Sequence, residues 1–586
     1  MTRERWILVW TRLTEGLSEA LRRVGLGEAR HRERLELAIP RDPDHGDWTT
    51  NIALLLAREA GKPPRALAEA LAAAFPPDPE TFASVEVAGP GFVNFRYSPR
   101  FLDALPSMIR GSDESFGASE GGGGVSVMVE YVSANPTGPL NVVSARAAAV
   151  GAALVRLLNA AGFRAVGEFY VNDAGRQVDL LGESFAARFA ETIGESRAFP
   201  EDGYRGSYVN DLAAELPQAE ARAALARGDM DWFRDQALER MLAWQRKDLQ
   251  AYGAEYARWF RETELHRAGK VDETLAELGA RGMTYVAREP ETASEDRPAN
   301  REAEKAPLEE ATFLRTSRFG DDMDRVVVRS NGAPTYLLPD IAYHRDKRAR
   351  GFRHVIDLWG PDHHGYVPRM KAALLALGLE PDFFEVLIVQ QVNLMSGGQP
   401  VKMSKRAGEF VTLRDLVDDV GADCAKFFFL MRSTSAHLDF DLDLAKRQND
   451  ENPAFYVQYA HARIASILRF AAERGLAPNP PGSVAVEDHA PEERALERRL
   501  AAFPEVVRGA AVAREPHRIP TYLMDTAAEF HRFYHACRVV SDDVEKSRRR
   551  LELTDAARIV LRNGLALMGV SAPERMSRAE AEASSV

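Results

Sequence analysis

The stretch from residue 125 to residue 173 constrains the fold more than any other part of the sequence. A β-branched run, VSVMVEYVS, leads through the turn ANPTGPL into an Ala/Leu-rich helix from about Ser144 to Ala161, and a second strand, FRAVGEFYVND, follows. Gly162 stands at the C-cap position of that helix. This order predicts a parallel sheet with a right-handed crossover. The turn before the helix is a place where main-chain N–H groups can hold phosphate.

Bulk properties narrow the class of protein. A chain of 586 residues is too long for one hydrophobic core. Its net charge of −12 means that an RNA partner would need local basic patches. The two cysteines, Cys424 and Cys537, lie far apart without metal-type spacing, which argues against a disulfide framework or a zinc site and fits a reducing cytoplasm. Charges interrupt the amphipathic N-terminal stretch, so it resembles neither a signal peptide nor a membrane span.

Composition predicts three domains. Residues 1–115 have the pattern of a small α+β domain, and the glycine-rich run before residue 125 marks a boundary. Residues 125–415 would form a Rossmann-like parallel-sheet domain with a mostly helical insertion at about 178–310, after which RVVVRSNGAPTYLL would resume the sheet, its Asn331–Gly332 being a hairpin signal. Residues 416–586 predict an all-α bundle. The predicted fold class is therefore α/β, with an α+β domain before it and a helical bundle after it.

A second informative stretch is GGQPVKMSKRAGEF. Lys402 and Lys405 flank Met403 and Ser404 in a loop with glycines on both sides. Two lysines on such a loop can close over a polyphosphate and neutralise charge that develops during its reaction. For the two lysines alone, a solvated basic loop is the more common explanation.

Several motifs in order resemble class I aminoacyl-tRNA synthetases, and among these the arginyl-tRNA synthetases. KMSKR is similar to their second signature. SANPTGPLNVVSARAAAVG is similar to their first signature in the form found in arginyl-tRNA synthetases. HGDWTTNIALLLAREAGKPPRALAEAL and VEVAGPGFVNF resemble their extra N-terminal domain, which contacts tRNA. YVNDAGRQ, DRVVVRSNGAPTYLLPDIAYHRDK and LWGPDHHGYVPRMKAAL resemble the catalytic core, and NPAFYVQYAHARIASI resembles the anticodon-binding bundle. The likeness covers nearly the whole chain.

The resemblance implies a pocket for arginine. The guanidinium group is a planar fork of donors that pairs with carboxylates. In the family, residues at the places of Glu130 and Asp340 bind the guanidinium, that of Asn135 binds the polar end of the amino acid, and that of Tyr336 lines the pocket. Taken singly, each has a plainer explanation: a solvated strand residue, a helix cap or an ordinary core ring.

The resemblance also implies an ATP site at the first signature, where this chain departs from the family pattern. The usual His-x-Gly-His is replaced by Asn141, Val142, Val143 and Ser144. Asn141 and Ser144 keep donors, although shorter and uncharged ones, and the loss of one transition-state donor costs about 2.7 to 4 kcal/mol. Val143 adds branched carbon where a glycine would admit adenine. The helix N-terminus, Arg146 and the lysine loop would compensate.

The residues expected to act in catalysis are Asn141, Ser144, Lys402 and Lys405. The residues expected to contact ATP are Pro136, Gly138, Val143, Gly360, Asp362, His363, His364, Met403 and Ser404. His363 and His364 follow a strand and could contact ribose, adenine or arginine; adjacent histidines without a third ligand are a weak sign of metal, and no metal site is expected.

The bundle supplies the residues expected to bind tRNA, which are Tyr456, Tyr459, His461 and Arg463. Aromatic and basic side chains on one helix can stack on unpaired bases and hold phosphates. On spacing alone, aromatic rings buried in the core of the bundle explain the pattern equally well.

The implied activity is the ATP-dependent attachment of L-arginine to tRNA(Arg) through an arginyl-adenylate. ATP would enter as its Mg²⁺ complex, with no tightly bound cofactor, and the first step would require tRNA, as is usual in the family. A cytoplasmic monomer without a membrane partner is expected. Two alternatives are a synthetase-like paralogue that binds RNA or arginine without activating it, and an ATP-using ligase with another acceptor. The intact lysine loop and carboxylate set favour the enzyme that attaches arginine to tRNA over these two alternatives.

Overall fold

The structure, a computed structural model, describes residues 8–27, 31, 34–40, 42–288, 310–401, 411–480 and 489–576. The chain forms two compact units: residues 1–123, 160–162 and 447–586 make one, and residues 124–159 and 163–446 make the other. The first division falls inside the glycine-rich run predicted as a boundary. The second falls after Lys446 rather than near residue 415. The division into three domains stays a prediction.

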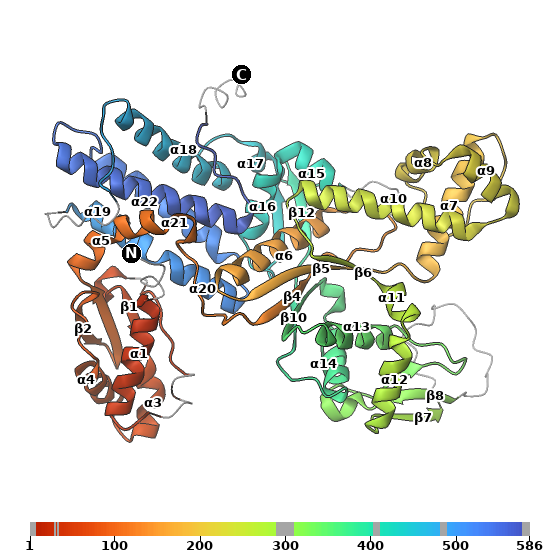
Figure 1. The fold of residues 1–586 in the computed structure, drawn as a ribbon, viewed down its shortest axis with the longest axis horizontal. Coiled ribbons are helices and arrows are strands. Elements are labelled where there is room, and N and C mark those ends of the chain that lie inside the picture. Colours follow the sequence, from red (N-terminus) through yellow and green to blue (C-terminus); the bar gives the residue numbers. More distant parts are fainter. Residues whose placement is uncertain are drawn as a thin grey trace. The chain divides into compact units, whose positions relative to one another are not determined.

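The unit of residues 124–446 is built around a five-stranded parallel sheet (Figure 1). Its strand order is β11-β10-β4-β5-β6, and every neighbouring pair is parallel. The strands are β4 (Ser126–Glu130), β5 (Arg164–Val171), β6 (Arg258–Arg261), β10 (His354–Trp359) and β11 (Phe384–Ile388). The helices that cover the sheet include α6 (Val142–Ala160), α13 (Leu337–Ala349) and α14 (Tyr366–Ala376). This arrangement confirms the predicted α/β class with a Rossmann-like parallel sheet.

Helices α6 and α13 cover opposite faces of the sheet. Side chains alternate along a strand, so Glu130 and Tyr131 at the end of β4 point to opposite faces. Lys347 of α13 contacts Glu130, whereas Tyr131 lies under α6, where a Cβ added to Gly151 would come within 2.2 Å of its ring. Helix α6 has the length and apolar composition of a membrane span, but 67% of its apolar window is buried inside the protein. It is therefore a core helix of this unit.

The chain between β5 and β6 forms a helical insertion with a core of its own. Its helices are α7 (Arg176–Thr192), α8 (Ser207–Ala214), α9 (Gln218–Arg227) and α10 (Met230–Ala251). Phe185, Phe189 and Phe233 are buried among them. The insertion ends before β6, so the predicted limit near residue 310 is too late. The reason is that β6 is a four-residue edge strand, RWFR, without the β-branched run that marks a strand in the sequence.

A small antiparallel sheet follows, with the order β7-β8-β9. Its strands and the two helices before it are α11 (Glu262–Arg267), α12 (Lys270–Ala280), β7 (Thr284–Arg288), β8 (Glu310–Leu314) and β9 (Arg325–Val328). The prediction that RVVV resumes the parallel sheet is wrong, because β9 pairs antiparallel with β8. The Asn331–Gly332 turn does form: Gly332 has φ 79° and the Arg329 N–H donates to the Ala333 carbonyl at 2.9 Å.

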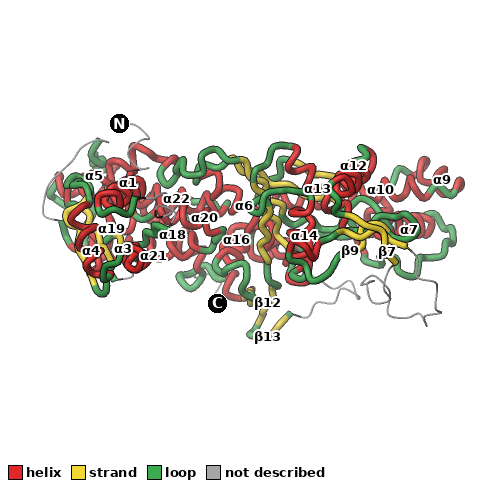
Figure 2. Tube along the Cα trace, turned by 90° about the horizontal axis from the view of Figure 1, so that it is seen from below, coloured by secondary structure: helices red, strands yellow, loops and turns green. Residues whose placement is uncertain are grey.

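The last part of this unit carries a three-stranded sheet of order β13-β12-β14. Its elements are β12 (Val392–Ser396), β13 (Gln399–Pro400), α15 (Leu413–Val420), α16 (Ala422–Leu430), β14 (Leu438–Asp441) and α17 (Leu442–Lys446). Figure 2 shows the β12–β13 hairpin in yellow. Strand β14 pairs parallel with β12. The prediction that the chain is helical throughout after Asp415 is therefore wrong.

The other unit begins with an α+β domain, as predicted. Its elements are α1 (Leu8–Arg23), β1 (Trp48–Thr50), α3 (Ile52–Ala60), α4 (Pro64–Ala74), β2 (Phe82–Ala88), β3 (Phe92–Tyr97) and α5 (Pro99–Ser112). The three strands form an antiparallel sheet of order β1-β3-β2. The bundle of the same unit consists of α18 (Pro453–Ala472), α19 (Pro491–Ala501), α20 (Phe503–Ala513), α21 (Arg518–Ala536) and α22 (Val544–Met568).

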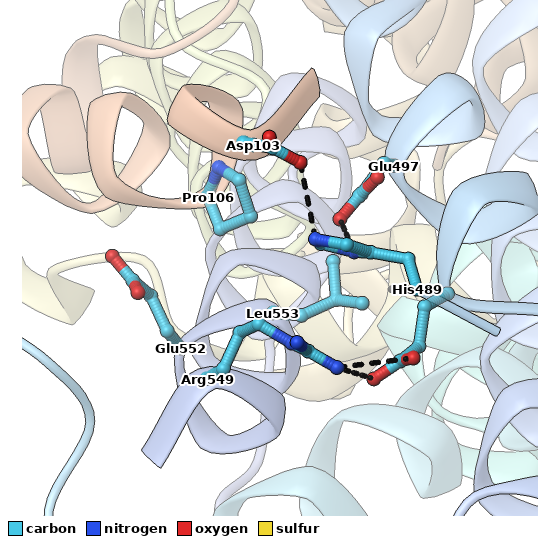
Figure 3. A pocket seen from close by; sticks show the side chains of 8 residues that line it. Asp103, Pro106, His489, Glu497, Arg549, Glu552 and Leu553 are labelled. Carbon is cyan, nitrogen blue, oxygen red and sulfur yellow. Dashed lines mark hydrogen bonds and ion pairs between the residues drawn. The ribbon is translucent and has the colours of Figure 1, made fainter. Parts of the chain in front are cut away.

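A buried ionic cluster joins α5 to the bundle (Figure 3). His489 Nε2 lies 3.0 Å from Asp103 Oδ1, and its Nδ1 lies 3.1 Å from Glu497 Oε1. Arg494 binds the same two carboxylates at 2.7 and 2.9 Å. These contacts link α5 to residues 489–497 and help to hold the N-terminal domain and the bundle in one compact unit.

Candidate active site

Three acidic residues stand side by side on adjacent strands of the parallel sheet. Glu130 of β4 is in register with Glu168 of β5 on one side and with Asp357 of β10 on the other. Lys347 Nζ, with 0% of its side chain exposed, lies 2.6 Å from Glu130 Oε2 and 3.0 Å from Asp357 Oδ1. Arg350 binds Glu168 through two nitrogens at 2.6 and 2.8 Å. The face of the sheet under α13 therefore holds a buried ionic network.

The network divides its charges unequally. Burial alone would raise the pKa of Asp357, but Lys347 and His344 beside it hold that pKa below its ordinary value. Burial raises the pKa of Glu130, and the charge of Asp357 adds to the rise while Lys347 opposes it. Asp357 therefore holds its negative charge more readily than Glu130, and the charged form of Glu130 gains more from a further cation. Its Oε1 also accepts from the Ser133 hydroxyl at 2.9 Å.

A second group of carboxyl groups lies next to Glu130. Asp340, in the first turn of α13, accepts a hydrogen bond from the Tyr366 hydroxyl at 2.9 Å. Burial raises the pKa of Asp340 to about 7; His344 and Tyr366 oppose the rise, and the charges of Glu262 and Glu130 add to it. Burial likewise raises the pKa of Glu262, although Tyr170 hydrogen-bonds to it. Asp340 therefore lies close to both Glu262 and Glu130, and we call these three carboxyl groups the acidic pocket. It would favour a cation that donates several hydrogen bonds.

Two of the predicted pocket residues lie in more open positions. Tyr336, just before α13, is 73% exposed, so its ring lies mostly in solvent rather than inside the acidic pocket. Asn135 is also exposed, and its side-chain amide donates to Gln177 Oε1 at 2.9 Å. The structure therefore gathers Glu130 and Asp340 and leaves Tyr336 and Asn135 at the surface.

The start of α6 is capped from within. Asn141 Oδ1 accepts from the backbone N–H groups of Val143 and Ser144, each at 3.0 Å, and lies 3.3 Å from the Ser144 hydroxyl. Asn141 is the N-cap residue, which satisfies two of the donors that a helix start otherwise leaves free. The expectation that main-chain N–H groups at this helix start bind a phosphate is therefore wrong for Val143 and Ser144, whose N–H groups bind Asn141 instead. The Ser144 hydroxyl also donates to Asn141 Oδ1, so the Asn141 Nδ2 group is the side-chain donor left for the proposed role, and the Ser144 hydroxyl would have to rotate to join it.

Arg146 does not face this helix start. It is fully buried, and its guanidinium donates to the carbonyls of Gln390 at 2.8 Å and of Ser433 and Ala436 at 2.9 Å. Burial lowers its pKa to about 10. The expectation that Arg146 adds charge at a phosphate is wrong, because its donors bind α6 to the connection between β11 and β12 and to the loop before β14.

The carboxyl end of β10 carries the predicted nucleotide residues. Gly360 precedes a short 3₁₀ turn, Pro361–His363, and Asp362, His363 and His364 are exposed there. The His363 ring lies 6.2 Å from that of Trp359. At the first signature, Pro136 is buried, whereas Gly138 and Val143 are half-buried. These positions border the edge of the sheet where open α/β folds bind ligands.

Lys402, Met403, Ser404 and Lys405 lie outside the described residues. The chain just beyond them meets the first signature: Thr412 forms a β-bridge with Asn141, and the Leu413 N–H donates to the Leu140 carbonyl at 2.7 Å. Thr412 and Asp415 form a capping box that starts α15. Main-chain contacts thus join the first signature to the chain that follows the lysine loop, although some 260 residues separate the two motifs in the sequence.

The predicted tRNA residues of the bundle separate into surface and interior. His461 is 2% exposed and its Nδ1 lies 2.9 Å from the Pro573 carbonyl. The expectation that it stacks on a base is therefore wrong, because the ring packs inside the bundle. Burial also lowers its pKa.

The other three predicted residues, Tyr456, Tyr459 and Arg463, are half-buried on α18. Rings of α21 lie beside two of them: His531 is 5.4 Å from Tyr456, and Tyr534 is 4.6 Å from the Arg463 guanidinium.

Comparison with known proteins decides the family. A model described as "Arginyl tRNA synthetase N terminal domain" matches residues 11–97, and one described as "DALR anticodon binding domain" matches residues 457–576. An arginine–tRNA ligase of Geobacillus kaustophilus is 43% identical over 571 residues, which cover 96% of this chain and 98% of the relative. The chain belongs to the arginine–tRNA ligase family. An arginine–tRNA ligase of Syntrophotalea carbinolica is 45% identical over 551 residues, covering 92% of this chain and 95% of that one.

The fold agrees with this arginine–tRNA ligase family. The Thermus thermophilus arginyl-tRNA synthetase superposes with a TM-score of 0.74 at 24% identity, covering 97% of this chain and 100% of that chain. The family resemblance inferred from the motifs is confirmed.

Sequence reasoning missed Glu262, the third carboxylate of the acidic pocket. Its signal was weak because β6 is short and follows a long insertion. An acid directly after the strand RWFR nevertheless stands at the carboxyl edge of the sheet, beside the predicted site.

Proposed function

We propose that this chain attaches L-arginine to tRNA(Arg) in two steps. The arginine carboxylate attacks the α-phosphorus of ATP, supplied as its Mg²⁺ complex, so that pyrophosphate leaves and arginyl-adenylate forms. A hydroxyl of the terminal ribose of the tRNA then attacks the arginyl carbonyl, and AMP leaves. Membership in the arginine–tRNA ligase family over nearly the full length supports this activity.

The observation that carries the substrate assignment is the acidic pocket at the carboxyl edge of the parallel sheet. Asp340 and Glu262 are both carboxyl groups whose burial raises the pKa, and Glu130 beside them shares one lysine with Asp357. A guanidinium would stabilise all three charged forms, and its donor fork suits two or more carboxylates. Asn135 would bind the amino-acid end and Tyr336 would cover the pocket from its exposed position.

Catalysis in this proposal is positioning and charge stabilisation. Lys402 and Lys405 would hold the phosphates together with the Asn141 Nδ2 group of the first signature. The Ser144 hydroxyl would add a donor by rotating away from Asn141 Oδ1. The proposed ATP contacts are Pro136, Gly138, Val143, Gly360, Asp362, His363, His364, Met403 and Ser404. On the bundle, Tyr456, Tyr459 and Arg463 would bind tRNA, with His531 and Tyr534 beside them. We further propose a cytoplasmic monomer, consistent with two free cysteines, Cys424 and Cys537; sedimentation of the purified chain tests the oligomeric state.

Isotope exchange between pyrophosphate and ATP tests the proposal. We expect exchange with arginine when tRNA is present and none without it. Arginine binding without exchange under any condition would instead indicate the non-catalytic paralogue, and exchange with a different amino acid would refute the assignment of the acidic pocket. Transfer of labelled arginine to tRNA(Arg), absent with a tRNA for another amino acid, tests the second step.

A further inference from the structure

The turn of the first signature is held from outside by the helical insertion. The Gln245 side-chain amide, on α10, donates to the carbonyl of Asn135 at 3.2 Å and to that of Gly138 at 2.9 Å. The Tyr208 hydroxyl, on α8, donates to the carbonyl between them, that of Thr137, at 2.7 Å. Three carbonyls of a four-residue turn are thus bound by two side chains of a different substructure.

Gln245 can hold this turn in only one way. Its residue is 1% exposed, so the amide is removed from water. Its Nε2 is the atom that donates to both carbonyls of the turn. Its Oε1 is buried without a hydrogen-bond partner among the described residues. A flipped amide would place that oxygen against two carbonyl oxygens, which repel it. The geometry of the turn is therefore fixed by one orientation of one side chain.

The hydrogen bonds set the direction of the opposite side of the turn. In a trans peptide the carbonyl of one residue and the N–H of the next point in opposite directions. Pro136 and Pro139 lack an N–H, so the Gly138 N–H is the donor whose direction the Tyr208 bond determines. It points away from the insertion. Gly138 also lies close to Tyr208, because an added Cβ would stand 3.3 Å from the hydroxyl.

The same helix reaches the other signature. Asp248, one turn after Gln245 on α10 and 3% exposed, accepts from Arg414 Nε at 2.9 Å and Nη2 at 2.5 Å. Arg414 belongs to the first turn of α15, where the N-cap Thr412 and the first residue Leu413 contact Asn141 and Leu140. The C-terminal half of α10 therefore contacts both sides of that junction, through Gln245 and Asp248.

We infer that Gln245 and Tyr208 are positioning residues for the activation step, acting through the Asn135–Gly138 turn, and that α10 couples this turn to α15 through Asp248. This inference rests on the proposed function for its kinetic consequence and on the hydrogen bonds alone for its structural one. The helical insertion then has a role in the reaction without touching a substrate.

The test compares three variants. Gln245→Met keeps the size and removes both donors, and Tyr208→Phe removes one hydroxyl. Tyr522→Phe is the matched control, because the Tyr522 hydroxyl donates to the Arg499 carbonyl at the same 2.7 Å, within the bundle. Relative to the parent, we expect the kcat of arginine-dependent exchange to fall about 10- to 100-fold in Gln245→Met and about 2- to 10-fold in Tyr208→Phe. The KM for tRNA should stay within about twofold, and the control should match the parent.

A fourth variant, Gln245→Glu, separates positioning from packing. An ionised glutamate there would repel the two carbonyls, whereas a protonated one can donate one hydrogen bond. Its kcat relative to the parent should therefore rise as the pH falls from 8 to 6, while the ratio for Gln245→Met stays flat. A packing role alone would leave both ratios flat, which would overturn the inference.

Amide hydrogen exchange keeps the inference testable apart from activity. Peptides that span residues 131–142 should exchange faster in Gln245→Met and Tyr208→Phe than in the parent and in Tyr522→Phe. A parent without arginine-dependent exchange would refute the proposed function and leave this arm to decide the structural claim. Unchanged protection of that segment, or full kcat in a folded Gln245→Met, would refute the inference itself.

Discussion

Asp340→Asn should improve the stability of the unliganded protein and impair its use of arginine. Burial raises the pKa of Asp340 from 3.8 to about 7, so the folded protein keeps a proton there that the unfolded chain releases at lower pH. The ionisation penalty is absent below about pH 4, grows as the pH rises, and is complete above about pH 7. At about 1.4 kcal/mol for each pH unit between the two values, it reaches about 4 kcal/mol. Asparagine removes that charge and still accepts from Tyr366.

The effect on arginine has the opposite sign. A guanidinium needs the ionised carboxylate, which is about half populated at pH 7 and about a tenth at pH 6 if the pKa is about 7. The parent should therefore show a KM for arginine that rises about fivefold between pH 7 and pH 6. Asp340→Asn should have a much higher KM without this dependence, measured by pyrophosphate exchange in the presence of tRNA.

Thermal melting at pH 8 and pH 4.5, without ligands, checks the stability claim. Asp340→Asn should melt above the parent at pH 8, and the difference should shrink at pH 4.5 to the equivalent of about 1 kcal/mol. Asp321→Asn is the control of opposite sign: burial alone would raise the pKa of Asp321, but Arg325, 2.8 Å away, holds it at about 2. That carboxylate stabilises the fold above about pH 4, by about 2 kcal/mol, and loses this effect as the pH falls towards 2. If Asp340→Asn melts below the parent at pH 8 and keeps the parental KM, the electrostatic reasoning about the acidic pocket is wrong.

Four further variants test the neighbouring features. Lys347→Met would leave Glu130 and Asp357 buried without their shared cation, and should destabilise the unit of residues 124–446 by about 3 to 5 kcal/mol; an unchanged melting curve would contradict the ionic network. Val143→Gly should lower the dissociation constant for ATP, measured by calorimetry, if the branched side chain crowds the adenine, and an unchanged constant would remove that argument. Asn141→Ala should destabilise α6 by about 1 kcal/mol through the lost N-cap and slow pyrophosphate exchange. Asn141→Asp keeps the N-cap, but its negative charge repels the phosphates, so we expect normal stability and a raised KM for ATP. If each of the two Asn141 variants loses activity only in proportion to its loss of stability, Asn141 acts as a helix cap alone.

The parallel sheet was predictable because its central strands are encoded locally. VSVMVE, the Pro/Gly turn, the Ala-rich helix and FRAVGEFYV each carry the residue types that their structure requires, and α6 begins within two residues of its predicted start. Strand β6 was not predictable, since a four-residue edge strand gains its place from neighbouring strands rather than from its own composition. The misplaced end of the insertion follows directly from that missing strand.

The candidate site was predictable where residue type implies chemistry and not where partners decide it. Glu130 and Asp340 lie together as the family likeness implied. The sequence does not reveal that Asn141 turns its oxygen back onto its own helix, or that His461 faces the interior, because each depends on groups that folding brings near: local N–H groups in one case and the Pro573 carbonyl in the other.

The burial of Arg146 has a consequence for how this family can vary. Its guanidinium binds carbonyl oxygens of residues 390, 433 and 436, and every amino acid provides such an oxygen. Substitutions at those three places leave the bonds intact, whereas lysine at 146 cannot reproduce a planar fork that reaches several acceptors at once. Related chains should thus keep an arginine here while its partners drift freely, and methods that infer proximity from correlated substitutions would not detect this contact.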